Sequence, residues 1–165
     1  MSTEPASTLT AAQARRERRE LRLAAELGIR TIQLAGYDVY YEEGTEKTRA
    51  DFLANLCRAA EMAEREGVQL GFETMETPFM DTVEKSMAYV SQEANPYLGV
   101  YPDVGNLTNA SFLYGTSVAD DIATGAGHIF AAHLKETEAG KYRDMSYSTG
   151  TTDYEGALGQ LVKQG

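Results

Sequence analysis

The sequence predicts an α/β protein with a parallel sheet, of a size that corresponds to about half of an eight-stranded β/α barrel. Short apolar runs alternate with longer segments of helical periodicity along the chain, which is the pattern of successive βαβ units. Only four such strands can be counted in 165 residues, whereas a complete barrel takes about 250 residues. A small open sheet is the alternative that this pattern leaves possible.

The first half of the chain contains two helical segments and the first strand. Helical spacing runs from Thr10 to Leu27 and again from Thr45 to Glu66, and a glycine follows each segment directly, as expected where a helix closes. Between them, the β-branched run Ile29–Ala35 predicts a strand. We expect residues 1–10 to be a disordered lead and residues 11–165 to form one partial-barrel domain.

The second half repeats the alternation, and each apolar run ends at a residue that can carry chemistry. The runs are apolar throughout, which is expected of strands covered on both faces. The expected elements are a strand at Val68–Phe72, a helix capped by Asp81 and running to about Glu93, a strand at Leu98–Tyr101, a weaker helix between Ser117 and Ala123, a strand at Ile129–Ala132, and a last helix capped near Asp153.

Composition and charge narrow the class of protein. The net charge of −10 disfavours nucleic acid as the main partner, because an acidic surface repels phosphate backbones. No apolar stretch approaches the ~20 residues of a membrane helix, so we expect no membrane association. Cys57 is the only cysteine, which excludes an internal disulfide and a cysteine-based zinc site and fits the cytoplasm. Five arginines between Arg15 and Arg22 form either an anion-binding arm or the solvated face of an acid-interleaved helix.

Three residues that can bind metal follow three successive predicted strands. Glu73, Asp103 and His133 are spaced 30 residues apart, one βα unit each time. Parallel strands deliver such residues to the same carboxyl edge, where α/β folds place their active sites. Two carboxylates and an imidazole there can hold a divalent cation, with manganese, magnesium or cobalt favoured by the oxygen ligands and zinc kept possible by the histidine. The alternatives are helix-capping acids and a structural histidine.

Four segments of the chain resemble bacterial L-ribulose-5-phosphate (L-xylulose-5-phosphate) 3-epimerases, which are also labelled hexulose-6-phosphate isomerases. The resemblance runs from about Arg22 to the C-terminus, in matching order and spacing. The four matching segments are Leu27–Tyr41 (LGIRTIQLAGYDVYY), Phe72–Thr77 (FETMET), Tyr101–Leu107 (YPDVGNL) and Ala132–Thr137 (AHLKET).

This resemblance implies a xylose-isomerase-like TIM barrel in which the four strands are strands four to seven. It implies that Glu73, Asp103 and His133 are metal ligands, and that Glu73 is also one of two catalytic acid/base groups. The second group in that family is a glutamate on strand eight, which also completes the metal site. The chain is therefore expected to be truncated at both ends relative to that family. Ser148–Gly150 departs from the Gly-Glu-Gly that the family carries after strand seven.

The chemistry that the resemblance implies explains these residue types. In a 2-ketose phosphate, the ketone acidifies the proton on C3, and a metal bound to O2 and O3 stabilises the enediolate formed on its removal. One carboxylate removes the proton from one face and a second returns it on the other, which inverts C3. Glu73 supplies one face.

The remaining candidates concern the substrate and the state of the chain. Tyr142–Asp144 matches a Phe-Arg-Asp sequence of the family, and Arg143 is therefore expected to contact the sugar phosphate. The alternative is that Arg143 lies in a solvated loop. Asn106 is expected either to orient substrate or to cap a helix, and Lys135 either to contact substrate or to pack at the strand end. The other function that the sequence allows is a non-catalytic barrel fragment that at most binds metal or associates with other chains. We expect self-association or pairing with a complementary fragment; a barrel-type hydrolase is disfavoured by the acidic charge and the two histidines.

Overall fold

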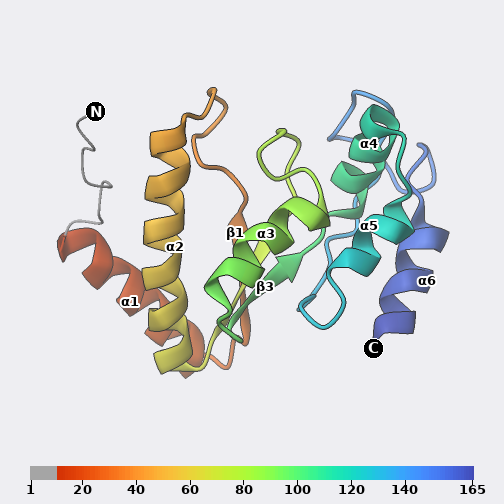
Figure 1. Ribbon diagram of the computed structural model, residues 1–165. Coiled ribbons are helices and arrows are strands. Elements are labelled where there is room, and N and C mark those ends of the chain that lie inside the picture. The colour runs from red at the N-terminus through yellow and green to blue at the C-terminus, as the bar shows by residue number, and fades with distance from the viewer. Residues whose placement is uncertain (1–10) are drawn as a thin grey trace.

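The computed structural model describes residues 11–165 and confirms the alternation of strands and helices (Figure 1). Three parallel strands form one sheet in the order β1-β2-β3, and helices follow each strand. The predicted disordered lead lies outside the described residues. The elements are α1 (Ala11–Glu26), β1 (Thr31–Ala35), α2 (Glu46–Glu66), β2 (Gln69–Glu73), α3 (Val83–Glu93), β3 (Leu98–Tyr101), α4 (Val104–Tyr114), α5 (Val118–Thr124) and α6 (Tyr154–Gln164).

Local capping chemistry sets where several helices begin and end. Thr45 and Thr48 form a reciprocal capping box at the start of α2, and Gly67 closes this helix with φ 70°. Asp153 caps α6 as predicted, by accepting a hydrogen bond from the Gly156 amide. The cap of α3 is Thr82 rather than the predicted Asp81, because the Asp81 carboxylate is engaged by the Lys85 ammonium at 2.5 Å.

Helix α4 is the element that sequence patterns did not predict. Its sequence, VGNLTNASFLY, contains glycine, asparagine and threonine, which are weak helix formers. Its first seven residues are all buried, so it shows no amphipathic period. Capping by Asp103 and tertiary burial therefore stabilise this helix in place of intrinsic propensity.

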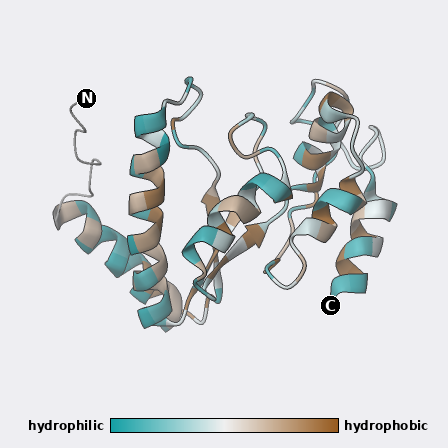
Figure 2. Ribbon diagram, viewed as in Figure 1, coloured by the Kyte–Doolittle hydropathy of each residue, from teal (hydrophilic) through white to brown (hydrophobic). Residues whose placement is uncertain are grey.

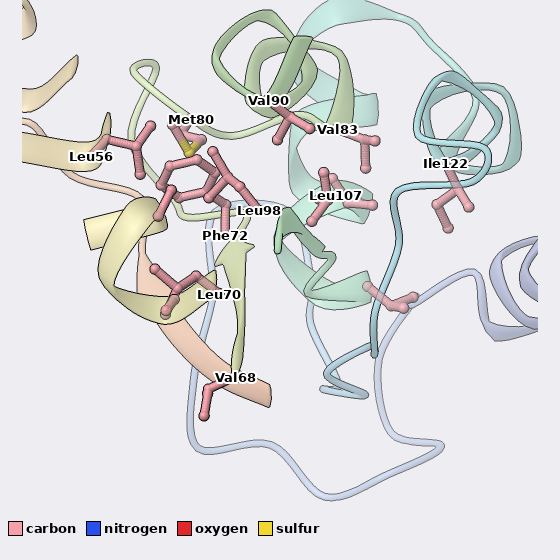
Figure 3. Packing of buried hydrophobic residues seen from close by; sticks show 14 of the residues in the cluster. Leu56, Val68, Leu70, Phe72, Met80, Val83, Val90, Leu98, Leu107 and Ile122 are labelled. Atoms are coloured by element: carbon pink, nitrogen blue, oxygen red, sulfur yellow. The ribbon is translucent and has the colours of Figure 1, made fainter. Parts of the chain in front are cut away.

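The sheet has two chemically different faces, which corrects the expectation of strands that are apolar throughout. The aligned rows Ile32–Leu70–Leu98 and Leu34–Phe72–Val100 carry the apolar side chains, and the last two positions of each row belong to the buried core (Figure 3). The alternate rows carry Thr31, Gln33, Gly71, Glu73 and other small or polar residues. Because side chains alternate along a strand, the buried core lies on one face and the opposite face is polar enough to hold a site.

Helices α1, α2 and α3 supply most of the remaining core on this side of the molecule. Leu56, Ala60 and Ala63 of α2 and Val83 and Val90 of α3 join the strands in one buried cluster. Figure 2 shows this division as brown strands and a brown stripe along α2, against a largely hydrophilic α1. The apolar stripe of each helix thus explains its place over the sheet.

The predicted strand at Ile129–Ala132 does not form a regular strand, and this expectation was wrong. Two isolated parallel bridges join the segment to β3 and its extension, Val100 with Ile129 and Asp103 with His133. Two residues lie between Val100 and Asp103, whereas three lie between Ile129 and His133. The second segment therefore contains one extra residue between the bridges. Pro102 lies within this interval and has no amide hydrogen to donate to a ladder. The pairing is therefore interrupted by a bulge.

The arginines of α1 lie on a solvated helix face interleaved with acids. Arg16 and Arg22 pair with Glu20 and Glu26 at i+4 distances of 2.9 Å and 3.1 Å. This arrangement supports the second of the two interpretations of the arginine cluster. Within residues 11–165, no helix combines the length and the apolar character needed to cross a lipid bilayer.

We predict that the 18.0 kDa chain self-associates through its sheet edges. Within the described residues β1 pairs only with β2, and β1 contains neither proline nor charge to block further pairing. Sedimentation velocity across a concentration range should show species larger than a monomer, and Gln33→Lys, which places a charge on this exposed edge, should shift them toward monomer. A single monomeric species at all concentrations of the unmodified chain would contradict this prediction. The polar inner face described above makes the strand edge, and not a bare apolar face, the expected contact.

Candidate metal centre

Glu73, Asp103 and His133 come together at the carboxyl edge of the sheet, as their spacing predicted. One ligand atom from each residue lies within 4.8 Å of the others. Glu73 is the last residue of β2, Asp103 follows β3, and His133 follows the bulged segment beside it. The convergence is therefore confirmed, while a metal-binding role stays a prediction.

Asp103 is the most firmly positioned of the three. Its side chain is 1% exposed, and its Oδ1 accepts the Asn106 amide hydrogen at 2.9 Å, which caps α4. Its own amide donates to Thr74 Oγ1 at 2.9 Å, which ties it to the loop after β2. Because Oδ1 and the backbone are occupied in this way, Oδ2 is the atom that faces the other two residues. The capping role foreseen as an alternative for Asp103 thus exists together with its place in the cluster.

The His133 imidazole bridges the two carboxylates. Its Nδ1 lies 2.8 Å from Glu73 Oε1 and 3.2 Å from Asp103 Oδ2. His133 is held in register by two backbone hydrogen bonds, from its amide to the Pro102 carbonyl and from the Val104 amide to its own carbonyl. Its side chain is 47% exposed, whereas that of Glu73 is 13% exposed, so the cluster opens toward solvent on the histidine side.

The three side chains form a donor set that fits a divalent cation. Ligand atoms about 2.0–2.3 Å from one ion lie roughly 3–4.5 Å from each other, close to the separations seen here. Two carboxylates and one imidazole suit manganese, magnesium, cobalt or zinc. Within residues 11–165, no other group of three or more such side chains meets this geometry.

Lys135 and Asn106, two predicted substrate residues, lie beside Asp103. The Lys135 ammonium contacts Asp103 Oδ2 at 2.9 Å and donates to Asn106 Oδ1 at 2.7 Å. Asn106 is buried, and its Nδ2 donates to the Thr74 carbonyl at 2.8 Å. Lys135 therefore orients the Asp103 carboxylate, while the Asn106 side chain links Lys135 to the Thr74 backbone, and contact of either side chain with substrate stays a prediction.

Arg143, the third predicted substrate residue, lies apart from the three ligand candidates. Its Nη2 donates to Glu76 Oε1 at 2.6 Å and to the Tyr41 hydroxyl. Glu76 lies three residues beyond Glu73, in the loop after β2, so Arg143 also belongs to the carboxyl edge. A hollow of about 360 Å³ between α3 and α5, lined by Lys85, Tyr114 and Asp121, shares no residue with this edge.

Sequence reasoning missed three residues that organise the site. Thr74 is fully buried and holds both Asp103 and Asn106. Glu136 accepts backbone amide hydrogens of Thr137, Ser148 and Thr152, and fixes both ends of the loop that carries Arg143. Desolvation by burial acts to raise the pKa of Glu136, but the hydrogen bonds from Thr152, Thr137 and Ser148 prevail and lower it.

The third missed residue is Glu76, which contacts Arg143 and two tyrosines. The usable sequence signal was its place as a second acid three residues after Glu73, in the loop that follows a strand. Thr74 and Glu136 gave no comparable signal, because a buried residue that satisfies loop amides has no characteristic spacing.

Comparisons with known proteins agree with this fold and edge. The family described as xylose isomerase-like TIM barrel matches residues 2–165. The chain is 37% identical over 148 residues to the L-ribulose-5-phosphate 3-epimerase UlaE of Escherichia coli, covering 90% of this chain and 51% of that protein. A Salmonella paratyphi C relative of the same name is 36% identical with the same coverage. The chain thus spans about half the length of the curated relatives it matches.

Solved structures show the same fold at low sequence identity. An L-ribulose 3-epimerase superposes with a TM-score of 0.75 at 20% identity, over 93% of this chain and 51% of that one. The IolI protein with a bound zinc atom gives a TM-score of 0.73 at 17% identity, over 92% and 56%. The parallel sheet, the polar carboxyl edge and the family match agree with the resemblance inferred from the sequence, and this chain belongs to the xylose isomerase-like TIM barrel family.

Proposed function

We propose that this chain carries metal-binding and proton-transfer groups of a metal-dependent 3-epimerase that acts on pentulose 5-phosphates, such as L-ribulose 5-phosphate and L-xylulose 5-phosphate. The observation that carries this proposal is the meeting of Glu73, Asp103 and His133 at one sheet edge. Support comes from the 37% identity to L-ribulose-5-phosphate 3-epimerases. Such a role in small-molecule sugar metabolism fits a cytoplasmic protein.

Glu73, Asp103 and His133 would hold a divalent cation of manganese, magnesium, cobalt or zinc. Such an ion, when bound, would supply Lewis-acid polarisation of the substrate ketone, which makes the proton on C3 more acidic. Asp103 presents Oδ2 to this position because its other oxygen is committed to the cap of α4. Lys135 contacts the same oxygen at 2.9 Å and so helps to fix its direction.

Glu73 is the base that would remove the C3 proton. Its Oε1 contacts His133, while within residues 11–165 no hydrogen bond reaches its Oε2, so one carboxylate oxygen is free to accept a proton. His133 holds Glu73 at the edge of the site and leaves this oxygen available. The substrate carbon C3 must lie within about 3 Å of Oε2 for such a transfer.

Substrate binding would use the cations at the same edge. Arg143 is largely exposed and its guanidinium has the planar fork that suits a phosphate group. Lys135 and Asn106 would reach the sugar only if substrate displaces their present contacts with Asp103 and with each other. Arg143 is therefore the best candidate for the phosphate end.

The proposal predicts proton exchange without efficient inversion when this chain is assayed alone. Glu73 is one base, and within residues 11–165 no other acidic side chain joins the three-residue centre from a second side. With Mn²⁺ and L-ribulose 5-phosphate in D₂O, deuterium should enter the substrate at C3, while L-xylulose 5-phosphate forms far more slowly. Mass spectrometry measures the deuterium incorporation. We expect weak metal binding, since a three-ligand site leaves positions open.

Two outcomes would count against this proposal. Exchange that persists in Glu73→Gln would show that another group is the base, since general base catalysis is worth about 10²–10⁴-fold. Absence of exchange in the unmodified chain at saturating Mn²⁺ would instead favour a non-catalytic, metal-binding fragment. Inversion at an ordinary enzymatic rate, about 1 s⁻¹ or more, would mean that this chain contains the second acid/base group.

A further inference from the structure

Four side chains from three separate loops meet at the carboxyl edge in a cluster distinct from the metal centre. Tyr37 and Tyr41 come from the loop after β1, Glu76 from the loop after β2, and Arg143 from the long loop after His133. Glu76 is the common partner: its Oε2 accepts from the Tyr37 hydroxyl at 2.9 Å, and its Oε1 accepts from Tyr41 and from Arg143. We call this group the Glu76 cluster.

Glu76 is a half-buried carboxylate at the centre of these contacts. Its side chain is only 13% exposed. Desolvation acts to raise its pKa, but hydrogen bonds from Tyr41, Tyr37 and Arg143 prevail and lower the pKa from 4.5 to about 2. Because the folded-state pKa lies below the ordinary value, the charged cluster stabilises the fold above about pH 4.5 and loses this contribution as the pH falls toward 2.

Arg143 is held at one side only. Both of its contacts use Nη2, and elsewhere in residues 11–165 no acceptor reaches its Nε or Nη1. Its side chain is 62% exposed, so Arg143 remains accessible to a ligand from solvent. An arginine anchored through one nitrogen and open at the other two donors has the geometry for an incoming anionic oxygen pair.

The surrounding backbone is organised to hold this arrangement. Glu136 fixes both ends of the loop that carries Arg143 through backbone amides. Tyr41 adopts a left-handed conformation with φ 52°, which is unfavourable for a residue with a side chain and needs compensating contacts. Its hydroxyl contacts both Glu76 and Arg143, so the ring lies within the cluster.

We propose that Glu76 is a positioning residue that fixes Arg143 through Nη2 so that Nε and Nη1 are presented to the phosphate group of the substrate. This inference rests on the proposed sugar-phosphate chemistry and assigns a role to a residue outside the metal centre. Glu76 does not touch the phosphate; it limits the rotamers of a long, flexible side chain before the phosphate arrives. The phosphate then binds to an arginine whose conformational freedom has already been reduced.

A purely electrostatic role for Glu76 predicts the opposite change in phosphate affinity when this residue is replaced, which makes the proposal testable. Glu76 is negative, so a purely charge-based view predicts that Glu76→Gln strengthens phosphate binding. The positioning role predicts weaker binding in Glu76→Gln, because Arg143 loses its charged anchor. Losing one hydrogen bond to a charged group corresponds to a fall in phosphate affinity of about tenfold.

The test is protection of Arg143 from phenylglyoxal by inorganic phosphate, read residue by residue by mass spectrometry. In the unmodified chain, phosphate should slow modification of Arg143 and leave Arg16 and Arg22, which are 81% and 71% exposed, unprotected at equal ionic strength. In Glu76→Gln, the phosphate concentration for half-protection should rise about tenfold. Glu76→Asp should recover part of the protection, and Glu155→Gln, the same change at an exposed site on α6, should leave it unaltered.

Each outcome has a defined meaning. Protection that is equal or stronger in Glu76→Gln overturns the positioning role, and absence of protection in the unmodified chain overturns the phosphate contact. Mn²⁺ binding measured on the same variants separates these failures from failure of the proposed function. Glu76→Gln should retain Mn²⁺ affinity, and a variant that loses both Mn²⁺ and phosphate binding would show that Glu76 only maintains the fold of the edge.

Discussion

Replacing Asp103 with alanine is expected to lower the free energy of unfolding by about 2–4 kcal/mol and to abolish metal binding, whereas asparagine should abolish metal binding at a smaller cost in stability. Alanine removes the cap of α4, worth about 0.5–2 kcal/mol, and leaves buried donors near the site unsatisfied at about 1–3 kcal/mol. Asparagine retains an oxygen for the Asn106 amide but loses the carboxylate charge. The two variants therefore separate the structural role of Asp103 from its ligand role.

Urea unfolding and Mn²⁺ titration of the same two proteins provide the measurements. Asp103→Asn should lose less stability than Asp103→Ala, because asparagine keeps the cap of α4, although it loses the ion pair with Lys135. Its Mn²⁺ affinity should fall at least about 100-fold, since even outer partners of ligands cost 10–100-fold. Undiminished Mn²⁺ affinity in Asp103→Asn would remove Asp103 from the ligand set.

Replacing Phe72 with alanine should cost about 3–5 kcal/mol of stability, the usual cost of emptying a core aromatic site. Phe72 is fully buried in the central strand β2, and its ring packs with Phe52 at 5.8 Å and with Tyr89 at 6.5 Å. Since whole domains are stable by only about 5–15 kcal/mol, this loss is a large fraction of the total free energy of unfolding. Denaturant unfolding followed by circular dichroism measures the loss.

Phe112→Ala is the matched control for this change. Phe112 lies on α4 with 53% of its surface exposed, so its removal should alter stability by no more than about 0.5 kcal/mol. A loss below about 1 kcal/mol in Phe72→Ala would show that the sheet packs differently from the arrangement in Figure 3. Because Glu73 follows Phe72 on the same strand, the variant should also weaken Mn²⁺ binding.

The features that the sequence predicted correctly have local or periodic causes. A glycine marked the end of α2, Asp153 marked the start of α6, and apolar runs marked β1, β2 and β3. The meeting of Glu73, Asp103 and His133 followed from parallel strands of equal spacing, which bring their ends to one edge. These signals depend only on neighbouring residues and on the repeat of the βα unit.

The features that could not be predicted depend on contacts between distant segments. Helix α4 has weak propensity and no amphipathic period, and it forms because its surroundings bury it. The Glu76 cluster joins residues as far apart as Tyr41 and Arg143, and no spacing rule relates these positions. The loss of the fourth strand also depends on a partner, because only the pairing with β3 makes Pro102 and the extra residue matter.

The bulge opposite Pro102 makes the site sensitive to the length of the chain as well as to its composition. Ile129 pairs with Val100, whose row faces the helices, and strict alternation from Ile129 would turn His133 toward the helices as well. Because the bulge absorbs the extra residue, His133 stays on the face that carries Glu73 and Asp103. Loss of that residue would leave a regular ladder with the histidine still opposite Asp103, whereas one more inserted residue between 130 and 132, if not absorbed by the bulge, would turn the imidazole away from the carboxylates. In this segment an insertion is therefore more hazardous than a deletion, and alignments of related chains need any gap placed at the bulge.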